Sequence, residues 1–135
     1  MDRVSRFYEV IKKEMGVTLA TAAQERVTMR TVSPVYYKGD ILIFTAPDSL
    51  KYRQLKENPN CCIAAGNFFA EARAEFLGAT MAEANEERRN AYCEKFPGAF
   101  DEGVAMGGRD AEFIQYRIKK LTGWAYENDV PGEDG

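Results

Sequence analysis

Histidine is absent from this sequence of 135 residues. It is the side chain most often used as a general acid or base near neutral pH, and it is also the commonest metal ligand. A protein without it must take its chemistry from elsewhere, for example from a bound cofactor. We expect no metal site.

Cysteine is scarce as well, with three residues, of which Cys61 and Cys62 are adjacent. If the apolar segment around this pair is a strand, the two side chains point to opposite faces of a sheet. The spacing indicates neither a disulfide framework nor a CxxC metal site.

Long apolar runs and a charge excess are also missing. No run approaches the roughly 18 to 20 residues that span a bilayer, and Met1-Asp2-Arg3 opens a charged amphipathic stretch instead of the apolar segment of a signal peptide. The 18 basic and 21 acidic residues leave a net charge of −3, which gives no general attraction to nucleic acid or anionic membranes. We therefore expect a cytoplasmic protein that binds neither.

What is present is the composition of an ordinary globular protein, with 45% hydrophobic and 29% charged residues. The length suits one domain with one core. We expect that domain over residues 1–126, followed by a flexible acidic tail at 127–135 that contains Pro131 and two glycines.

Hydrophobic periodicity predicts the elements. Apolar residues recur at helical spacing in 2–15, with Asp2 as a candidate cap and Gly16 as a terminator. Asp48 and Asn85 are candidate caps for two further helices, at 49–58 and from 85 onward. Strands are predicted at 17–21, 27–32, 35–37, 41–45, 61–67, 72–84 and 113–126, with a loop at 68–71 between the fifth and sixth. The pattern favours an antiparallel barrel of about six strands with helical additions.

The helix predicted at 49–58 carries a hydroxyl, Ser49, and an ammonium, Lys51, in its first turn. A helix N-terminus already bears about half a positive charge, so a lysine there is mildly unfavourable unless an anion lies nearby. Free amides, the Ser49 hydroxyl and Lys51 together suit a phosphate group. The alternative is an ordinary exposed lysine, whose penalty is only a few tenths of a kcal/mol.

Arg30 is a second candidate phosphate ligand. It lies in the predicted strand 27–32, on the same side as Thr28 and Val32, and a guanidinium can hold a phosphate through two parallel hydrogen bonds. A solvent-facing strand arginine is the alternative. The helix start with Ser49 and Lys51 and the strand with Arg30 support each other as phosphate ligands. They lie at opposite ends of a single unit made of a strand, a hairpin and a helix.

The order of these features resembles a known family. A first helix precedes "GVTLAT", then "VTMRTVSPVYY", "GDILIFT" and "SLKYRQLKENPNCCIA". This order, with its S-x-K-x-x-Q-L-x-x-N-P pattern, resembles the pyridoxamine 5′-phosphate oxidase-like FMN-binding split barrels. The resemblance implies a mainly β (α+β) fold, an antiparallel six-stranded split β-barrel with flanking helices.

The resemblance also implies FMN as the cofactor. Carried over to this sequence, the phosphate ligands are Arg30, Ser49 and Lys51. The residues beside the ribityl chain and phosphate are Phe44 and Thr45. Backbone groups for the edge of the isoalloxazine ring come from Met29, Thr31 and Val32.

Members of this family typically hold the flavin at a two-fold dimer interface, so the resemblance implies a homodimer. Arg73 and Trp124 are the candidates for completing the site from the second subunit. For these two, the alternatives are a solvated strand residue and a packed aromatic.

The reaction is narrowed by differences from the family. Pyridoxamine phosphate oxidase has a second basic residue beside the lysine and a C-terminal Arg/His pair, whereas this chain has Leu50 and no histidine. We therefore expect a flavin-dependent oxidoreductase acting on a small organic molecule other than vitamin B6. Tyr36 and Tyr37, with Arg73, are possible substrate contacts. The alternatives are a non-catalytic FMN-binding electron carrier, a flavin-storage protein, or a related barrel using deazaflavin; haem would lack its usual histidine.

Overall fold

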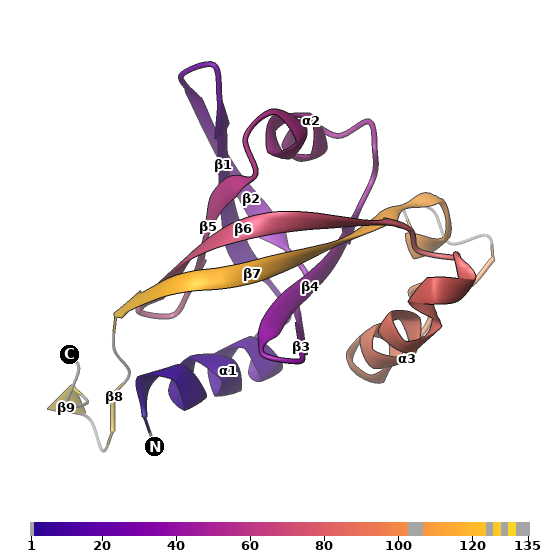
Figure 1. Ribbon diagram of the computed structural model, residues 1–135. Helices are drawn as coiled ribbons and strands as arrows, with labels where there is room; N and C mark the ends of the chain where they lie inside the picture. The colour runs from indigo at the N-terminus through magenta and orange to yellow at the C-terminus, as the bar shows by residue number, and fades with distance from the viewer. Residues whose placement is uncertain (1, 103–106, 124–125, 128–129, 132–135) are drawn as a thin grey trace.

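The computed structural model describes residues 2–102, 107–123, 126–127 and 130–131. Figure 1 shows the elements in chain order. They are α1 (Arg3–Lys13), β1 (Val17–Ala23), β2 (Arg26–Val32), β3 (Val35–Tyr37), β4 (Asp40–Thr45), α2 (Leu50–Glu57), β5 (Asn60–Ala65), β6 (Phe68–Ala79), α3 (Glu86–Lys95), β7 (Glu112–Gly123), β8 (Tyr126–Glu127) and β9 (Val130–Pro131), with short 3-10 turns at Glu83–Asn85 and Gly108–Asp110.

One antiparallel sheet dominates the described chain, in the order β2-β1-β5-β6-β7-β4-β3. It is not closed, because β2 and β3 are its two edges. The sheet has seven strands, so the predicted number of six is wrong. The short strand β3 lies at the predicted segment 35–37 and pairs with β4 across the Lys38-Gly39 turn, where both residues have positive φ.

The β5–β6 connection differs from the prediction. It is a turn at Gly66-Asn67, with Gly66 at φ 58°, and β6 already begins at Phe68. The predicted loop 68–71 is therefore strand, because Phe68 and Ala70 are buried and alternate with exposed neighbours. The same strand ends at Ala79 and not at residue 84.

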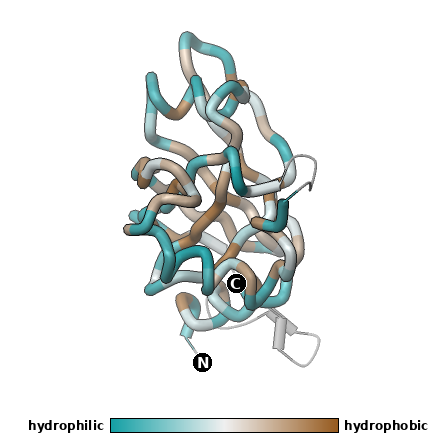
Figure 2. The backbone as a smooth tube through the Cα atoms, turned by 90° about the vertical axis from the view of Figure 1, so that its right-hand side faces the viewer, coloured by the Kyte–Doolittle hydropathy of each residue, from teal (hydrophilic) through white to brown (hydrophobic). Residues whose placement is uncertain are grey.

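The apolar side chains of the coiled sheet form the main core. Phe7 and Ile11 of α1 cover one end of it and are fully buried. Asp2 caps this helix as predicted, since its carboxylate accepts the Ser5 amide at 2.8 Å. Figure 2 shows the apolar strand segments at the centre of the molecule and the polar segments toward its outside.

A second apolar cluster lies where α3 packs beside β3, β4 and β7 (Figure 1). Its centre is Tyr92, whose hydroxyl donates to the Ser33 carbonyl at 2.7 Å. Asn85 stands at the N-cap position of α3 but does not cap it; its amide instead donates to Leu77 and Ala79 of the preceding strand. That amide fastens the start of α3 to the end of β6.

The C-terminal strand prediction is partly met. β7 ends at Gly123, and Trp124 lies outside the described residues. Tyr126–Glu127 pairs with Val130–Pro131 in a separate two-stranded sheet, and the rest of the predicted tail is outside the described chain. In the described ranges, no helix is long and apolar enough to cross a membrane.

Candidate functional site

The helix α2 begins immediately after the strand β4, and Ser49 is its N-cap. The Ser49 hydroxyl accepts the Tyr52 amide at 3.3 Å and donates to the Ala46 carbonyl at 2.8 Å. The predicted cap, Asp48, is therefore one residue too early. Because the Ser49 hydroxyl has one proton, it can donate to a ligand only if it gives up its hydrogen bond to the Ala46 carbonyl.

Two backbone N–H groups at the start of α2, those of Leu50 and Lys51, have no acceptor among the described residues. The Lys51 side chain is half-buried and has no ion-pair or hydrogen-bond partner in the same part of the chain. Burial lowers the pKa of Lys51, and the charge of nearby Arg30 lowers it further. The helix start thus presents free donors and a cation that nothing described neutralises.

Arg30 comes from the adjacent edge of the sheet, and its guanidinium lies close enough to Lys51 to disfavour that lysine's charge. Nη1 donates to the Leu19 carbonyl at 3.1 Å and to Thr21 Oγ1 at 2.8 Å, and Nη2 donates to Thr28 Oγ1. Burial lowers the pKa of Arg30 too. No carboxylate in the described ranges pairs with either cation, so the structure brings the sequence-predicted Arg30 and Lys51 near each other without a negative partner.

Gln54 is a member of this site that the sequence reasoning missed. It is only 5% exposed, and its Oε1 accepts the Thr21 and Thr28 hydroxyls, each at 2.6 Å. The signal for it was the glutamine of the S-x-K-x-x-Q pattern. A spacing of five residues from Ser49 does not by itself say which face of α2 is covered by the hairpin.

Thr45 and Phe44 end the strand that leads into α2. Thr45 is buried, and its hydroxyl lies 3.2 Å from the Ser49 hydroxyl. The Phe44 ring belongs to the second apolar cluster, 5.0 Å from the Tyr92 ring and 5.7 Å from the Phe100 ring. Thr45 thus lies at the start of α2, and Phe44 lies between the cleft and the second apolar cluster.

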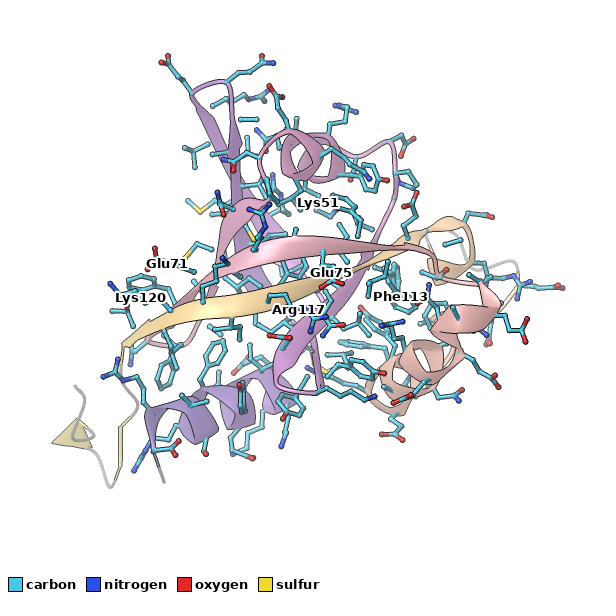
Figure 3. All side chains as sticks on the ribbon, viewed as in Figure 1. Lys51, Glu71, Glu75, Phe113, Arg117 and Lys120 are labelled. Carbon is cyan, nitrogen blue, oxygen red and sulfur yellow. The ribbon has the colours of Figure 1, made fainter. Side chains whose placement is uncertain are left out.

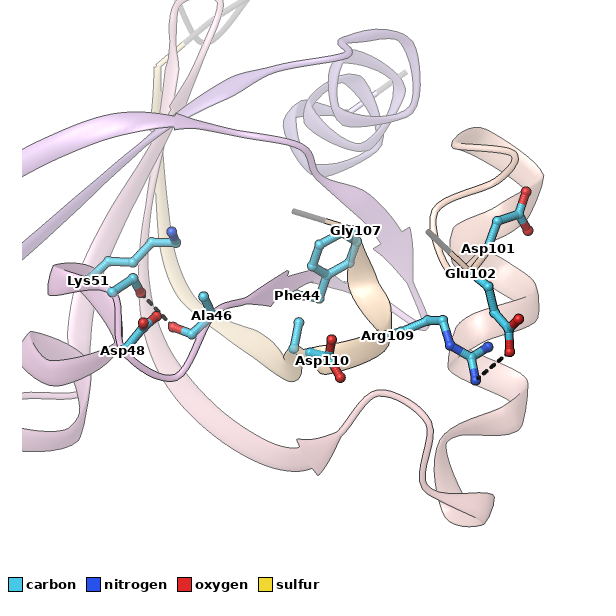
Figure 4. A pocket seen from close by; sticks show the side chains of 11 residues that line it. Phe44, Ala46, Asp48, Lys51, Asp101, Glu102, Gly107, Arg109 and Asp110 are labelled. Carbon is cyan, nitrogen blue, oxygen red and sulfur yellow. Dashed lines mark hydrogen bonds and ion pairs between the residues drawn. The ribbon is translucent and has the colours of Figure 1, made fainter. Parts of the chain in front are cut away.

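A cleft of about 640 Å³ opens beside the helix start (Figure 4). It runs from Lys51 and Ser49 past the Phe44 ring to the segment that carries Arg109. Its rim also holds four acidic side chains, which are Asp48, Asp101, Glu102 and Asp110. Arg109 donates to the Phe100 carbonyl at 3.3 Å and lies 4.0 Å from Glu102. Of the two cations that line the cleft, Lys51 is therefore the one without an ion-pair partner among the described residues.

The edge strand β2 carries the three residues predicted to face a flavin ring through their backbone. β2 pairs only with β1 in the described chain, so half of its backbone polar groups face away from the sheet. Met29 is 71% exposed and Thr31 is exposed, whereas the Val32 side chain is buried. All three flank Arg30 on the free edge.

Arg73 is not brought near Arg30 and Lys51 within one chain. It lies on the exposed side of β6, opposite Asn60 and Arg117. Glu75 of the same strand and Arg117, both labelled in Figure 3, form an ion pair at 2.6 Å on this exposed side. The other candidate for a second-subunit contact, Trp124, is outside the described residues.

The tyrosines proposed as substrate contacts are engaged in packing. The Tyr36 ring lies 4.8 Å from that of Tyr8, and Tyr37 is buried in the second apolar cluster. Across the described ranges there is no group of three or more cysteine or acidic side chains that could hold a metal ion.

The sequence matches no protein-family model and no curated protein. Solved structures, in contrast, share its fold. One is a FAD-binding protein from Mesorhizobium loti, with a TM-score of 0.69 and 14% identity over 90% of this chain and 92% of that chain. Another is a candidate pyridoxamine 5′-phosphate oxidase from Listeria innocua, with a TM-score of 0.67 and 10% identity over 89% and 96% of the two chains.

A third similar structure is HutZ, a haem storage protein from Vibrio cholerae, with a TM-score of 0.72 and 16% identity over 91% of this chain and 95% of that chain. At these identities the likeness concerns the fold alone. The predicted fold type is thereby supported: the chain has the mainly β, split-barrel architecture found in flavin-binding and haem-storing proteins.

Proposed function

We propose that this protein binds FMN and holds the terminal phosphate with Arg30, Lys51 and the first N–H groups of α2. The observation that carries the proposal is the pair of neighbouring, partly buried cations without a carboxylate partner among the described residues. Two such charges are unfavourable side by side unless an anion joins them. Flavin, when bound, supplies hydride and one-electron chemistry.

The two cations favour FMN over other flavins. A terminal phosphomonoester carries about −1.5 to −2 charges at neutral pH, which matches Arg30 and Lys51. Each internal phosphate of FAD or of a deazaflavin cofactor carries a single charge, and riboflavin has no phosphate. The other predicted contacts complete the proposal, with Ser49 and Thr45 at the phosphate, Phe44 along the ribityl chain and the free edge of β2 along the ring.

The proposed activity is that of a flavin-dependent oxidoreductase acting on a small organic molecule, in a homodimer whose second subunit contributes Arg73 or Trp124. A second candidate is a non-catalytic flavin carrier or store. It draws support from the fold that the chain shares with HutZ, a haem storage protein. Reduction of the bound flavin by a nicotinamide cofactor and reoxidation by added acceptors would distinguish the enzyme from an inert carrier.

The phosphate assignment is tested by titrating FMN, riboflavin and FAD into ligand-free protein. Arg30→Ala and Lys51→Ala should each weaken FMN binding roughly 10- to 100-fold, since a hydrogen bond to a charged group contributes about 1.5 to 3 kcal/mol. Riboflavin binding should not change. Lys56→Ala is the matched control, a lysine of the same helix that lies 4.0 Å over the Phe76 ring.

The absorbance spectrum and mass of the ligand that copurifies give an independent check. A haem spectrum, or equal loss of FMN and riboflavin affinity in the Arg30 and Lys51 variants, would overturn the assignment.

A further inference from the structure

Gln54 is buried and does not line the cleft. Its Oε1 accepts two hydroxyl groups at 2.6 Å, one from Thr21 on β1 and one from Thr28 on β2. Its Nε2 donates to the Arg26 carbonyl at 3.3 Å. One side chain of α2 thus joins both strands of the hairpin that carries Arg30.

The direction of each hydrogen bond in this group is fixed. An amide oxygen can only accept, so the hydroxyl protons of Thr21 and Thr28 both point at Gln54. The threonine oxygens are then left with lone pairs alone, and both accept from the Arg30 guanidinium, Thr21 at 2.8 Å. Nη1 also donates to the Leu19 carbonyl at 3.1 Å, so both Nη atoms make hydrogen bonds within the hairpin. The Nε–H and one Nη2–H have no partner among the described residues.

Every acceptor that holds the guanidinium is neutral. They are two hydroxyls and one backbone carbonyl, with a neutral amide behind them. A carboxylate at position 54 would also accept both hydroxyls, but it would place a negative charge beside Arg30 and Lys51. The arrangement fixes the guanidinium without neutralising it.

We propose that Gln54 is a positioning residue that orients Arg30 through Thr21 and Thr28 and, because it is neutral, leaves the charge of Arg30 to a bound anion. The inference rests on the proposed phosphate site, which it deepens, and it assigns to Gln54 no contact with the ligand.

A double-mutant cycle tests the path through the threonines, with inorganic phosphate and FMN as probes in calorimetric titrations. Thr21→Val combined with Thr28→Val removes both hydroxyls at constant shape and should weaken binding of either probe roughly 5- to 10-fold. In an Arg30→Ala background the same pair should cause no further loss. An equal loss in both backgrounds would overturn the proposal, because a general structural effect does not depend on Arg30.

Gln54→Glu tests the role of neutrality. The carboxylate still accepts both threonine hydroxyls but loses the Nε2 donor to the Arg26 carbonyl. It should weaken phosphate binding at least about 10-fold at low salt, with a smaller difference from wild type at high salt. Asn58→Leu is the matched control, since Asn58 also ties α2 to β1, through the Ala22 carbonyl at 3.0 Å, but does not contact Arg30. Equal losses in the two variants would mean that only the attachment of the helix matters.

A measurement on the ligand-free protein separates this proposal from the proposed function. Hindered rotation of the Arg30 guanidinium, followed by nitrogen NMR of the arginine side chain, should be slow in wild type and faster in the threonine double variant. If wild type binds neither phosphate nor FMN, the proposed function fails while this result still stands. Identical rotation in the two proteins would overturn the positioning role.

Discussion

Tyr116 illustrates at the residue scale how the barrel interior combines apolar packing with polar groups. It is fully buried on β7 opposite Ala74, and its hydroxyl has no hydrogen-bond partner among the described residues. Burial raises the pKa of Tyr116. The small inward side chains of β6, Ala70, Ala72 and Ala74, leave room for this large ring. A buried hydroxyl without a partner costs about 1 to 3 kcal/mol.

Removing that hydroxyl should therefore stabilise the protein. We expect Tyr116→Phe to raise the free energy of unfolding by about 1 kcal/mol, as measured by urea denaturation of the ligand-free protein. Tyr92→Phe is the control, because the Tyr92 hydroxyl donates to Ser33 at 2.7 Å, and it should lower the same quantity by about 1 kcal/mol. Similar losses in both variants would show that Tyr116 has a partner, such as an ordered water molecule.

Lys51 should make stability depend on pH. Because burial and Arg30 lower its folded-state pKa below the ordinary 10.5, the unfolded chain binds more protons between the two pKa values. The free energy of unfolding contributed by this group therefore rises with pH through that interval, and the penalty is fully present below the folded pKa.

Lys51→Met should thus be more stable than wild type at about pH 7, since the two side chains have similar helix propensities. The difference should narrow as the pH rises toward 10.5, the ordinary value. Phosphate at saturation should reverse the order of the two proteins. A difference that stays constant with pH, in denaturation curves without ligand, would contradict the assigned cause.

At this scale the sequence indicates which residues are unusual better than it indicates their contacts. Lys51 could be recognised because a cation at a helix start is locally unfavourable, and Arg30 because of the family resemblance. Gln54 could not, since its role depends on hydroxyls that lie 26 and 33 positions away. The cap was misplaced by one residue because Asp48 and Ser49 are both good caps, and only the backbone path from β4 selects the serine.

At the scale of elements, local signals located the strands but not all of their ends. Gly66 and Asn67 form the turn, yet the prediction extended the preceding strand to residue 67 and put the loop at 68–71. In the structure Glu71 faces outward while Ala70 and Ala72 face the core. Alternation within a strand next to a bulge is hard to distinguish from a loop, and β6 carries such a bulge between Glu71 and Ala72.

Two glycines of the β6–β7 ribbon allow a matched test of backbone constraint. Both have positive φ, Gly78 at 78° and Gly123 at 119°. A Cβ at Gly78 would meet nothing within 4 Å, whereas one at Gly123 would lie 2.1 Å from the Asn67 carbonyl oxygen. The backbone of the β5–β6 turn cannot yield as a flexible side chain can.

We expect Gly78→Ala to lower the free energy of unfolding by about 1 kcal/mol, the cost of the backbone conformation alone. Gly123→Ala should lower it by about 3 kcal/mol or more, because the turn must also shift. Thermal unfolding of the two variants provides the comparison. Equal effects would show that the β5–β6 turn adjusts freely.

At the scale of the molecule, alternating strands and turn residues were enough to predict a mainly β fold with flanking helices. They also located the short strand β3, which pairs with β4 across a two-residue turn. They did not predict the order of the strands in the sheet, in which β3 forms one edge. How the sheet coils also depends on β6 and β7, which pair across nearly their whole length. Contacts of that range leave no local signature in the sequence.

The exposed side of β2, β1, β5 and β6 is the surface on which we expect the second subunit. Val27 and Met29 are 70% and 71% exposed there, and Phe69 is 42% exposed. The positions opposite Met29 across the sheet are Ala20 and then Cys62, both small. Small side chains between large exposed apolar ones make a surface that another sheet can approach closely, and such patches mark interaction sites.

Met29→Glu should therefore shift the protein from dimer to monomer in light-scattering measurements and weaken FMN binding, because the partner's share of the site is lost with the interface. Val4→Glu is the control, a substitution of a 47% exposed residue on α1, away from this surface, and it should change neither property. If Met29→Glu remains dimeric and loses only FMN affinity, the edge strand contacts the flavin directly and the subunits meet elsewhere. If it becomes monomeric but binds FMN as wild type does, one chain holds the cofactor alone, and Arg73 and Trp124 have no part in the site.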